Sequence, residues 1–171
     1  LQVTGSSFVG GLCGYNKEGT ITSYYATGAV SGTSYVGGLC GLNYKGTITS
    51  CYATGAVSGT DSVGSLCGRN SGTITSCYAT GAVSGTSYVG GLCGWNFYGT
   101  ITSSYATGAV SGIESVGGLC GYFSGGTISA CFWDTDTSGR TTSDGGTGKT
   151  TAQMRDINTF FNAGWDFAVT D

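Results

Sequence analysis

The sequence predicts an all-β fold: a parallel β-solenoid (β-helix) of about five coils of 26–27 residues, followed by a short helical C-terminal cap. The main observation is that three sequence blocks recur with one shared period. A composition rich in glycine and strand-forming residues, and the alternation of apolar and polar residues within a block, agree with it. We therefore divide the chain into solenoid repeats at 1–133 and a capping segment with a short helix at 134–171.

The repeat is nearly identical from copy to copy. Its first block, VGGLCG or VGSLCG, begins at Val9, Val36, Val63, Val89 and Val116. These copies lie 27, 27, 26 and 27 residues apart, and the blocks GTITS and YATGAVSG follow with the same period. The shorter repeat has only Ser71 between its Asn and Gly, in a polar segment where a turn tolerates a deletion. Helical repeats are excluded, because each glycine would cost about 1 kcal/mol in a helix.

The composition excludes several classes of protein. The chain has 34 glycines but no proline, so it is not collagen-like, and with 39% apolar residues it is not disordered. Six scattered basic residues and a net charge of −3 predict no nucleic-acid partner. No apolar run approaches the ~20 residues that span a bilayer, so we expect no membrane insertion.

Alternation within the GTITS block predicts which side chains form the core. Ile21 lies between two threonines, so it faces one side of a strand and the threonines face the other. If each repeat makes one coil, equivalent residues stack roughly 4.8 Å apart. We expect a buried isoleucine column of Ile21, Ile48, Ile74, Ile101 and Ile128. We also expect an amide ladder at a turn, formed by Asn16, Asn43, Asn70 and Asn96, and glycines that supply positive φ or close approach at corners.

The VGGLCG block leaves one question open. Strict alternation would put Leu12 and Cys13 on opposite faces of a strand, although both are apolar. Either the glycines bend the chain, or this strand is covered on both sides.

The cysteines fall at two positions of the repeat. One column contains Cys13, Cys40, Cys67, Cys93 and Cys120, and the other contains Cys51, Cys77 and Cys131. Stacked cysteines lie within disulfide range, so disulfides among these eight are one interpretation, and buried hydrophobic thiols are the other. Eight cysteines with few charges favour an oxidising, extracellular setting. Metal binding is disfavoured, because no close CxxC pair occurs.

The two ends of the solenoid differ. In the segment from Thr151, one helical face would carry Met154, Ile157 and Phe161, with Gly164 as a stop. We expect this helix to cover the end of the core, with Trp165 and Phe167 adding apolar cover. Leu1 enters within a repeat, with Val3 matching Val30, so we expect a removed leader or a fragment, and an open first coil able to accept another copy head-to-tail.

The sequence predicts no enzyme. Without histidine, the usual hydrolytic triads and His-bound metals are unavailable, and no pair of carboxylates recurs between repeats. The stretch around Lys149 lacks the first glycine of a phosphate loop. We expect no cofactor. One calcium candidate, Asp134, Asp136 and Asp144, competes with a polar turn.

Two surface features are candidate binding sites. The first is an array of outward threonines: Thr20, Thr22, Thr47, Thr49, Thr73, Thr75, Thr100 and Thr102. Regular Thr-x-Thr arrays resemble those of some insect antifreeze proteins, although exposed strands prefer threonine anyway. The second is a set of aromatic residues, Tyr15, Tyr44, Trp95, Phe97, Tyr98 and Tyr122, which could contact sugar rings or proteins, or serve as ladder stabilisers.

The repeat also carries a family resemblance. The unit from Tyr25 to Ile48, with its Gly-Leu-x-Gly core written GLCG, resembles the GLUG repeat, and the segment 131–154 looks like the stretch that follows the last such repeat. The resemblance covers about 3–167 and implies a module of bacterial or archaeal surface and secreted proteins, including adhesin-like chains. In peptidases that carry such repeats, the catalytic machinery resembles a zinc site in a separate domain. This sequence has no match to that domain, so the resemblance does not imply protease activity. The position of Cys13 is more often valine-like in the family.

These expectations combine into one functional hypothesis. We expect a non-catalytic, extracellular or cell-surface structural or adhesive protein whose partners are other copies of itself, other surface proteins or glycans. The alternative is a solenoid surface that binds ice or glycans through the threonine array or the exposed aromatics.

Overall fold

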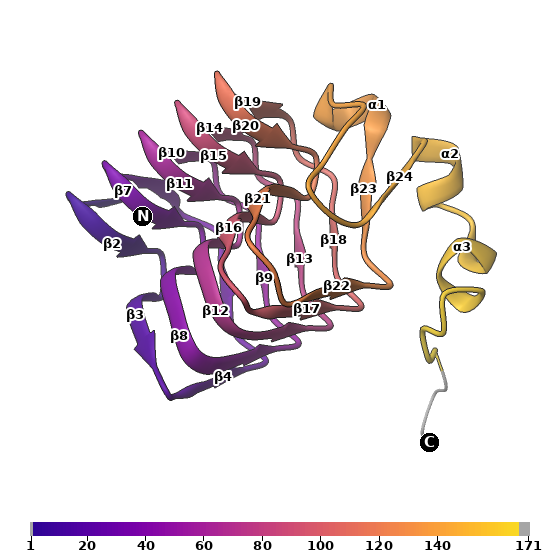
Figure 1. Ribbon diagram of the computed structural model, residues 1–171, viewed down its shortest axis with the longest axis horizontal. Coiled ribbons are helices and arrows are strands. Elements are labelled where there is room, and N and C mark those ends of the chain that lie inside the picture. The colour runs from indigo at the N-terminus through magenta and orange to yellow at the C-terminus, as the bar shows by residue number, and fades with distance from the viewer. Residues whose placement is uncertain (1, 168–171) are drawn as a thin grey trace.

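The computed structural model describes residues 2–167, which form a parallel β-solenoid of about five coils stacked along the long axis of the molecule (Figure 1). Each coil contributes to four parallel sheets, which we call A to D in chain order. Sheet A contains β1 (Gln2–Thr4), β6 (Ala29–Ser31), β10 (Val57–Ser58), β14 (Val83–Ser84) and β19 (Val110–Ser111). Sheet B contains β2 (Ser7–Gly10), β7 (Ser34–Gly37), β11 (Asp61–Gly64), β15 (Ser87–Gly90) and β20 (Glu114–Gly117).

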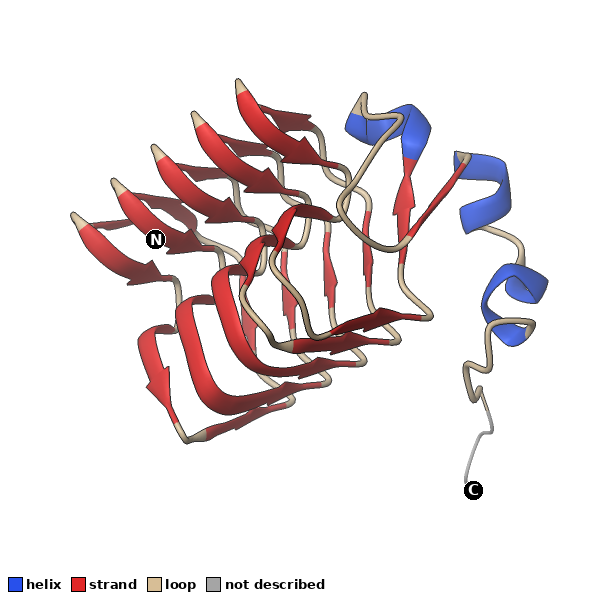
Figure 2. Ribbon diagram, in the orientation of Figure 1, coloured by secondary structure: helices blue, strands red, loops and turns tan. Residues whose placement is uncertain are grey.

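The other two sheets complete each coil. Sheet C contains β3 (Cys13–Lys17), β4 (Thr20–Thr22), β8 (Cys40–Thr49), β12 (Cys67–Thr75), β16 (Cys93–Asn96), β17 (Thr100–Thr102), β21 (Cys120–Phe123) and β22 (Thr127–Ser129). Sheet D contains β5 (Tyr25–Ala26), β9 (Tyr52–Ala53), β13 (Tyr78–Ala79), β18 (Tyr105–Ala106), β23 (Phe132–Asp134) and β24 (Thr147–Lys149). Three short helices follow β23: α1 (Thr135–Ser138), α2 (Thr151–Met154) and α3 (Ile157–Phe161), all near the C-terminus (Figure 2).

The strand register confirms that one repeat makes one coil. Equivalent residues pair directly, for example Ile48 with Ile74 and Ile74 with Ile101. The single-residue deletion appears as a register shift between Ser71 and Thr73, at the turn where the sequence places it. The isoleucine column is buried in four copies, and Ile128, in the last coil, is partly buried.

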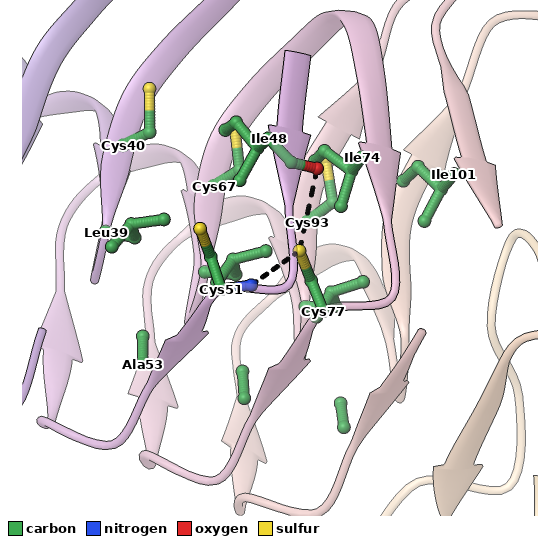
Figure 3. Close-up of a cluster of buried hydrophobic side chains, with 14 of the residues drawn as sticks. Leu39, Cys40, Ile48, Cys51, Ala53, Cys67, Ile74, Cys77, Cys93 and Ile101 are labelled. Carbon is green, nitrogen blue, oxygen red and sulfur yellow. Dashed lines mark hydrogen bonds between the residues drawn. The ribbon is translucent and has the colours of Figure 1, made fainter. Parts of the chain in front are cut away.

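The interior holds two parallel columns of core. The larger contains stacked leucine, isoleucine, cysteine and alanine side chains (Figure 3), and the smaller contains only valines. Val36 belongs to the valine core, whereas Leu39 and Cys40 both belong to the larger one. The chain bends at Gly38 and Leu39, between β7 and β8. A Cβ on Gly38 would lie 2.1 Å from the Ser65 carbonyl oxygen of the next coil, so only glycine fits this bend. Of the two alternatives left open above, the glycine bend is therefore correct.

Of the two roles expected of the corner glycines, close approach is the one found in most coils, and positive φ occurs only in the last coil, at Gly125 and Gly126. Glycine is needed there for close approach, as at Gly38. The other positive φ angles of the repeats fall on recurring non-glycine positions: Phe8, Glu18, Ser23, Tyr35, Lys45, Ser50, Ser62, Ser76, Tyr88, Tyr98, Ser103, Ser115 and Ala130. The regular stacking of coils over-determines these left-handed residues, whose cost is of order 1 kcal/mol each.

The amide ladder forms as predicted and is buried. Asn16 Nδ2 donates to Asn43 Oδ1 at 2.8 Å, Asn43 to Asn70 at 2.9 Å, and Asn70 to Asn96 at 2.8 Å. Each amide also donates to a turn carbonyl of its own coil, such as Gly46. The ladder thus satisfies the backbone at the turn inside sheet C and joins four coils.

The C-terminal end of the core is covered differently from the prediction. Trp133 occupies the position of the small Ala106, Ala79 and Ala53 of the earlier coils, and its indole packs against Gly118. The loop after α1 completes the cover: the Ser143 hydroxyl accepts from the backbone N–H of Leu119 and Cys120, both in the last coil. A tryptophan and a loop, rather than a helix, therefore close the core.

The segment predicted as one helix forms two, α2 and α3, and the prediction that Ile157 and Phe161 lie on a buried face was wrong. The side chains of Ile157 and Phe161 are 60% and 66% exposed, and the neighbouring Phe160 makes the ring contacts. Phe160 and Trp165 pack against rings on the outer face of sheet D. Gly164 has a φ of 84°, as expected of a residue that ends a helical segment. None of the described helices has the length and apolar character needed to cross a bilayer.

The strands of the first described coil are hydrogen-bonded to a neighbouring coil on one side. Val3 pairs with Val30, as predicted, and among the described residues β1 to β4 pair only with the strands of the second coil. Leu1 lies outside the described residues, as do the last four residues of the 134–171 segment. Asp134 continues β23, and β24 extends sheet D, so the solenoid sheet continues past residue 133.

Candidate functional site

The predicted threonine array lies on the second half of sheet C, opposite the isoleucine column. The pairs are in register from coil to coil, as for Thr73 with Thr100 and Thr75 with Thr102. Thr20 and Thr22 are exposed, whereas the threonines of the middle coils are half-buried. The hydroxyl of Thr102 donates to that of Thr75 at 2.9 Å. The array is therefore regular, and part of its hydrogen-bonding capacity is used within the protein.

The first cysteine column runs along sheet C inside the larger core (Figure 3). Its members pair in register from Cys13 to Cys120, and the thiols of Cys67 and Cys120 donate to the carbonyls of Arg69 and Tyr122. The contact with Cys40 and burial raise the pKa of Cys13, and burial raises that of Cys93. All eight cysteines of the chain are free thiols in this structure, and seven of them are buried. The column is therefore a stack of free thiols of which all but Cys13 are buried.

The second cysteine position has a specific hydrogen-bonding role. Cys77 Sγ accepts from the backbone N–H of Cys51 in the preceding coil at 3.4 Å and donates to the carbonyl of Thr75 at 3.1 Å. Ser104 occupies the same position one coil later and makes the same two bonds, from the N–H of Cys77 and to the carbonyl of Thr102. In these two coils, a small side chain that both accepts and donates occupies the corner. In the first coil the position is taken by Tyr24, whose side chain is exposed.

The three acidic residues of the calcium candidate have structural partners. Asp134 is buried and caps α1, accepting from the backbone N–H groups of Asp136 and Thr137. Asp144 accepts from the N–H of Phe123 in the last coil. Over residues 2–167, no cluster of three or more acidic or cysteine side chains has a geometry that could hold a metal ion.

The predicted aromatic residues belong to a continuous surface strip, which we call the aromatic belt. It consists of Phe8, Tyr15, Tyr35, Tyr44, Tyr88, Trp95, Phe97, Tyr98 and Tyr122, on the outside of sheets B and C. Its rings contact one another with centroids 5.0–6.4 Å apart. Tyr98 is 69% exposed and Tyr15 46%, so the belt presents ring surface to solvent.

Arg69 joins the two halves of the belt. Its guanidinium lies 4.4 Å from the ring centroid of Trp95, 4.3 Å from that of Phe97 and 5.8 Å from that of Tyr35. Its buried Nε has no hydrogen-bond partner, and the ring faces compensate part of that cost. Arg69, Leu42 and Trp95 occupy equivalent positions of the repeat and therefore stack in register. Tyr35 and Tyr88, which have positive φ and extend the belt, were not among the aromatic residues predicted from the sequence.

Sheet D carries a second set of rings. Tyr25, Tyr52, Tyr78 and Tyr105 stack face to face, with centroids 4.9–5.2 Å apart and planes within 7°. Burial, and then the neighbouring phenol, raise the pKa of Tyr78 and Tyr105. This ladder ends beneath α3, where Tyr105 lines a pocket that sequence reasoning did not identify.

Comparison with known proteins identifies the repeat. The model of the GLUG motif matches residues 32–58, 59–84 and 85–111, which are three successive coils. No curated protein and no solved structure matches the chain. Residues 32–111 of this solenoid are therefore three consecutive GLUG repeats.

Proposed function

We propose that this protein is a non-catalytic structural or adhesive module that works outside the cell or at its surface and attaches to other surface proteins or glycans through the aromatic belt. The observation that supports the proposal is the belt itself: its rings lie on four of the five coils, Arg69 bridges the third, and Tyr15, Tyr98 and Tyr122 are exposed. Tyrosine and tryptophan provide large contact areas at a low cost in conformational entropy. In-register columns beneath the belt hold its rings at fixed spacing.

The polar groups of the solenoid support a structural role. The amide ladder bonds to itself and to turn carbonyls, and Asp134 is occupied as a helix cap. Asp134 and Asp136 share Thr151 as a hydrogen-bond donor: its hydroxyl donates to the carboxylate of Asp134 and its backbone N–H donates to that of Asp136. We therefore place the function on the outer surface of the coils.

A binding assay with a triple variant tests the proposal. Tyr15→Ser, Tyr98→Ser and Tyr122→Ser together remove exposed ring surface from the belt. The probes are insoluble β-1,4-glucan, insoluble β-1,4-linked N-acetylglucosamine polymer and a collagen-coated surface. We expect the wild type to be retained on at least one probe and the triple variant to lose at least tenfold in affinity.

A matched control separates the belt from general surface hydrophobicity. Tyr24→Ser, Ile113→Ser and Phe161→Ser remove three comparably exposed apolar side chains elsewhere. Equal losses for both triple variants, or no retention of the wild type on any probe, would count against adhesion through the belt.

Head-to-tail assembly into a filament is an extension of this proposal. Strands β1 to β4 leave one edge unpaired among the described residues. Such an edge accepts a parallel strand, and a contact between two different ends propagates as a fibre. An upstream coil of the same polypeptide would occupy the same edge, so the assembly needs a direct test. Negative-stain images of the 171-residue chain should contain fibres that lengthen with concentration, and a monodisperse monomer at high concentration would exclude them.

Recognition of ice or a glycan by the threonine array is a second candidate. The observation in its favour is the in-register pairing of threonines over five coils. Thermal hysteresis of the wild type should disappear in Thr47→Lys/Thr73→Lys and persist in Thr33→Lys/Thr54→Lys, which places the same charge on exposed threonines elsewhere. Freezing curves of the wild type that match those of an inert protein would remove this candidate.

A further inference from the structure

A pocket of about 510 Å³ lies at the C-terminal end of sheet D, on its outer face. Sheet D forms one wall, and α2, α3 and the segment that follows form the other; Figure 1 places these helices beside β23 and β24, past the last coil. The volume is within the range of sites that bind small molecules, roughly 300–1,000 Å³. The pocket is separate from the aromatic belt, which lies over sheets B and C.

Four aromatic rings form the apolar walls. Tyr105, at the end of the tyrosine ladder, faces Phe160 of α3 at 6.0 Å and Trp165 at 6.2 Å. Trp165 and Phe167 are nearly parallel, with an angle of 21° between planes 6.3 Å apart at their centroids. The indole N–H of Trp165 donates to the carbonyl of Ala130 at 2.9 Å, which fixes that ring to the solenoid. The walls are therefore held in place before any ligand arrives.

Two charged side chains line the pocket, Asp134 and Arg155, and only the first already has hydrogen-bond partners within the described residues. The carboxylate of Asp134 accepts from the N–H of Asp136 at 2.9 Å and of Thr137 at 3.2 Å, and from the hydroxyl of Thr151 at 2.7 Å. The guanidinium of Arg155 is exposed and makes no ion pair or side-chain hydrogen bond within residues 2–167. The charge that the pocket offers to a ligand is therefore positive.

We propose that this pocket binds a small organic acid whose body is flat and apolar. The body would lie against Trp165, Phe167 and Tyr105, and the carboxylate would pair with Arg155. A guanidinium binds a carboxylate through two parallel N–H···O bonds, which fixes the orientation of the acid. The inference goes beyond the proposed adhesive function and does not depend on it.

Titration of the full chain with indole-3-acetate, followed by calorimetry, tests the proposal. Indole-3-acetamide is the matched probe, because it has the same shape without the charge. We expect saturable binding of the acid, at least tenfold tighter than binding of the amide. Hexanoate and glucuronate, which carry the carboxylate on a flexible chain and on a polar ring, should bind more weakly than indole-3-acetate.

Variants assign the binding to the pocket. Arg155→Gln should weaken binding of the acid at least tenfold and leave binding of the amide unchanged, whereas Lys17→Gln, which removes one charge in the first coil, should change neither. Trp165→Leu should weaken both probes. Equal binding of acid and amide, an Arg155→Gln variant that binds like the wild type, or no saturable binding at millimolar concentrations of the acid would each overturn the proposal. The belt triple variant should bind the acid normally, so failure of the adhesion proposal is distinguishable from failure of this one.

Discussion

At the scale of single residues, the second cysteine position shows why both cysteine and serine occupy it after the first coil. A left-handed serine or alanine precedes it in every coil, as Ser50 precedes Cys51. The backbone N–H of the residue at this position donates to the equivalent side chain of the next coil and not to a carbonyl; the N–H of Cys51, for example, donates to Cys77 Sγ. Cysteine and serine both meet this need, so the thiols at this position act as hydrogen-bonding groups. The sequence suggested disulfides or inert hydrophobes, because the bond depends on a corner geometry that only the stacked coils define.

Substitution of Cys77 tests this role. Cys77→Ser should retain both bonds, as Ser104 does, and change the free energy of unfolding by less than about 1 kcal/mol. Cys77→Val keeps apolar volume but leaves the buried N–H of Cys51 without an acceptor, which costs about 1–3 kcal/mol. Urea unfolding of both variants measures the difference. A valine variant as stable as the serine variant would contradict the hydrogen-bonding role.

The buried thiols also predict how stability depends on pH. Burial raises the pKa of Cys131 from 9.0 to about 11, and that of Cys93 also rises. Because the pKa of the thiol is higher in the folded protein, the thiol of the unfolded chain ionises first as the pH rises. The contribution of the buried thiol to stability is therefore fully present below pH 9 and is lost as the pH rises toward 11. Each such thiol lowers the free energy of unfolding by about 1.4 kcal/mol per pH unit in that window. Urea unfolding between pH 7 and pH 11 measures the slope, and Cys131→Ser should reduce it by one thiol's share. A flat profile above pH 9 would contradict the burial.

At the scale of elements, the strands and ladders were predictable and the corners were not. Alternation within the GTITS block placed Ile48 and its equivalents inside, and the period placed each asparagine above the next. These predictions follow from local pattern and stacking alone. The left-handed corners at serine and tyrosine, such as Ser50 and Tyr35, override local propensity and arise because the neighbouring coil holds them. The aromatic belt depends on those corners, so its extent was not predictable.

The amide ladder should be more sensitive in its middle than at its end. Asn70→Ala removes a donor to Asn96 and an acceptor for Asn43, both buried, and should cost about 2–4 kcal/mol in the free energy of unfolding. Asn16→Ala removes only the first donor of the ladder and should cost about 1 kcal/mol. Urea unfolding compares the two variants. Equal losses would mean that the asparagines act separately and not as a ladder.

At the scale of the whole molecule, the sequence predicted the solenoid because the fold repeats, and it failed where repetition stops. The predicted helix over the core was based on Met154, Ile157 and Phe161, but helical spacing does not state which surface a helix will meet. The end of the core is covered by Trp133, which occupies the position that alanine holds in the earlier coils. The pocket at Arg155 was equally hidden, because sheet D, α2 and α3 bring its residues together across a long stretch of sequence.

Trp133→Ala tests how the end of the solenoid is held. The variant restores the residue that earlier coils carry, but it leaves the end of the larger core without the indole that covers it, a loss of about 3–5 kcal/mol for a buried tryptophan. Because each coil contacts only its neighbours, the damage should be local. Hydrogen exchange should therefore show that the amides of β22 and β23 lose protection first, while those of β8 and β12 keep it. Trp95→Ala, which removes an indole from the aromatic belt, is the control and should leave the last coil protected. Uniform loss of protection in Trp133→Ala would mean that the solenoid unfolds as a single unit, and unchanged protection of β22 and β23 would mean that the loop around Ser143 closes the core without the indole.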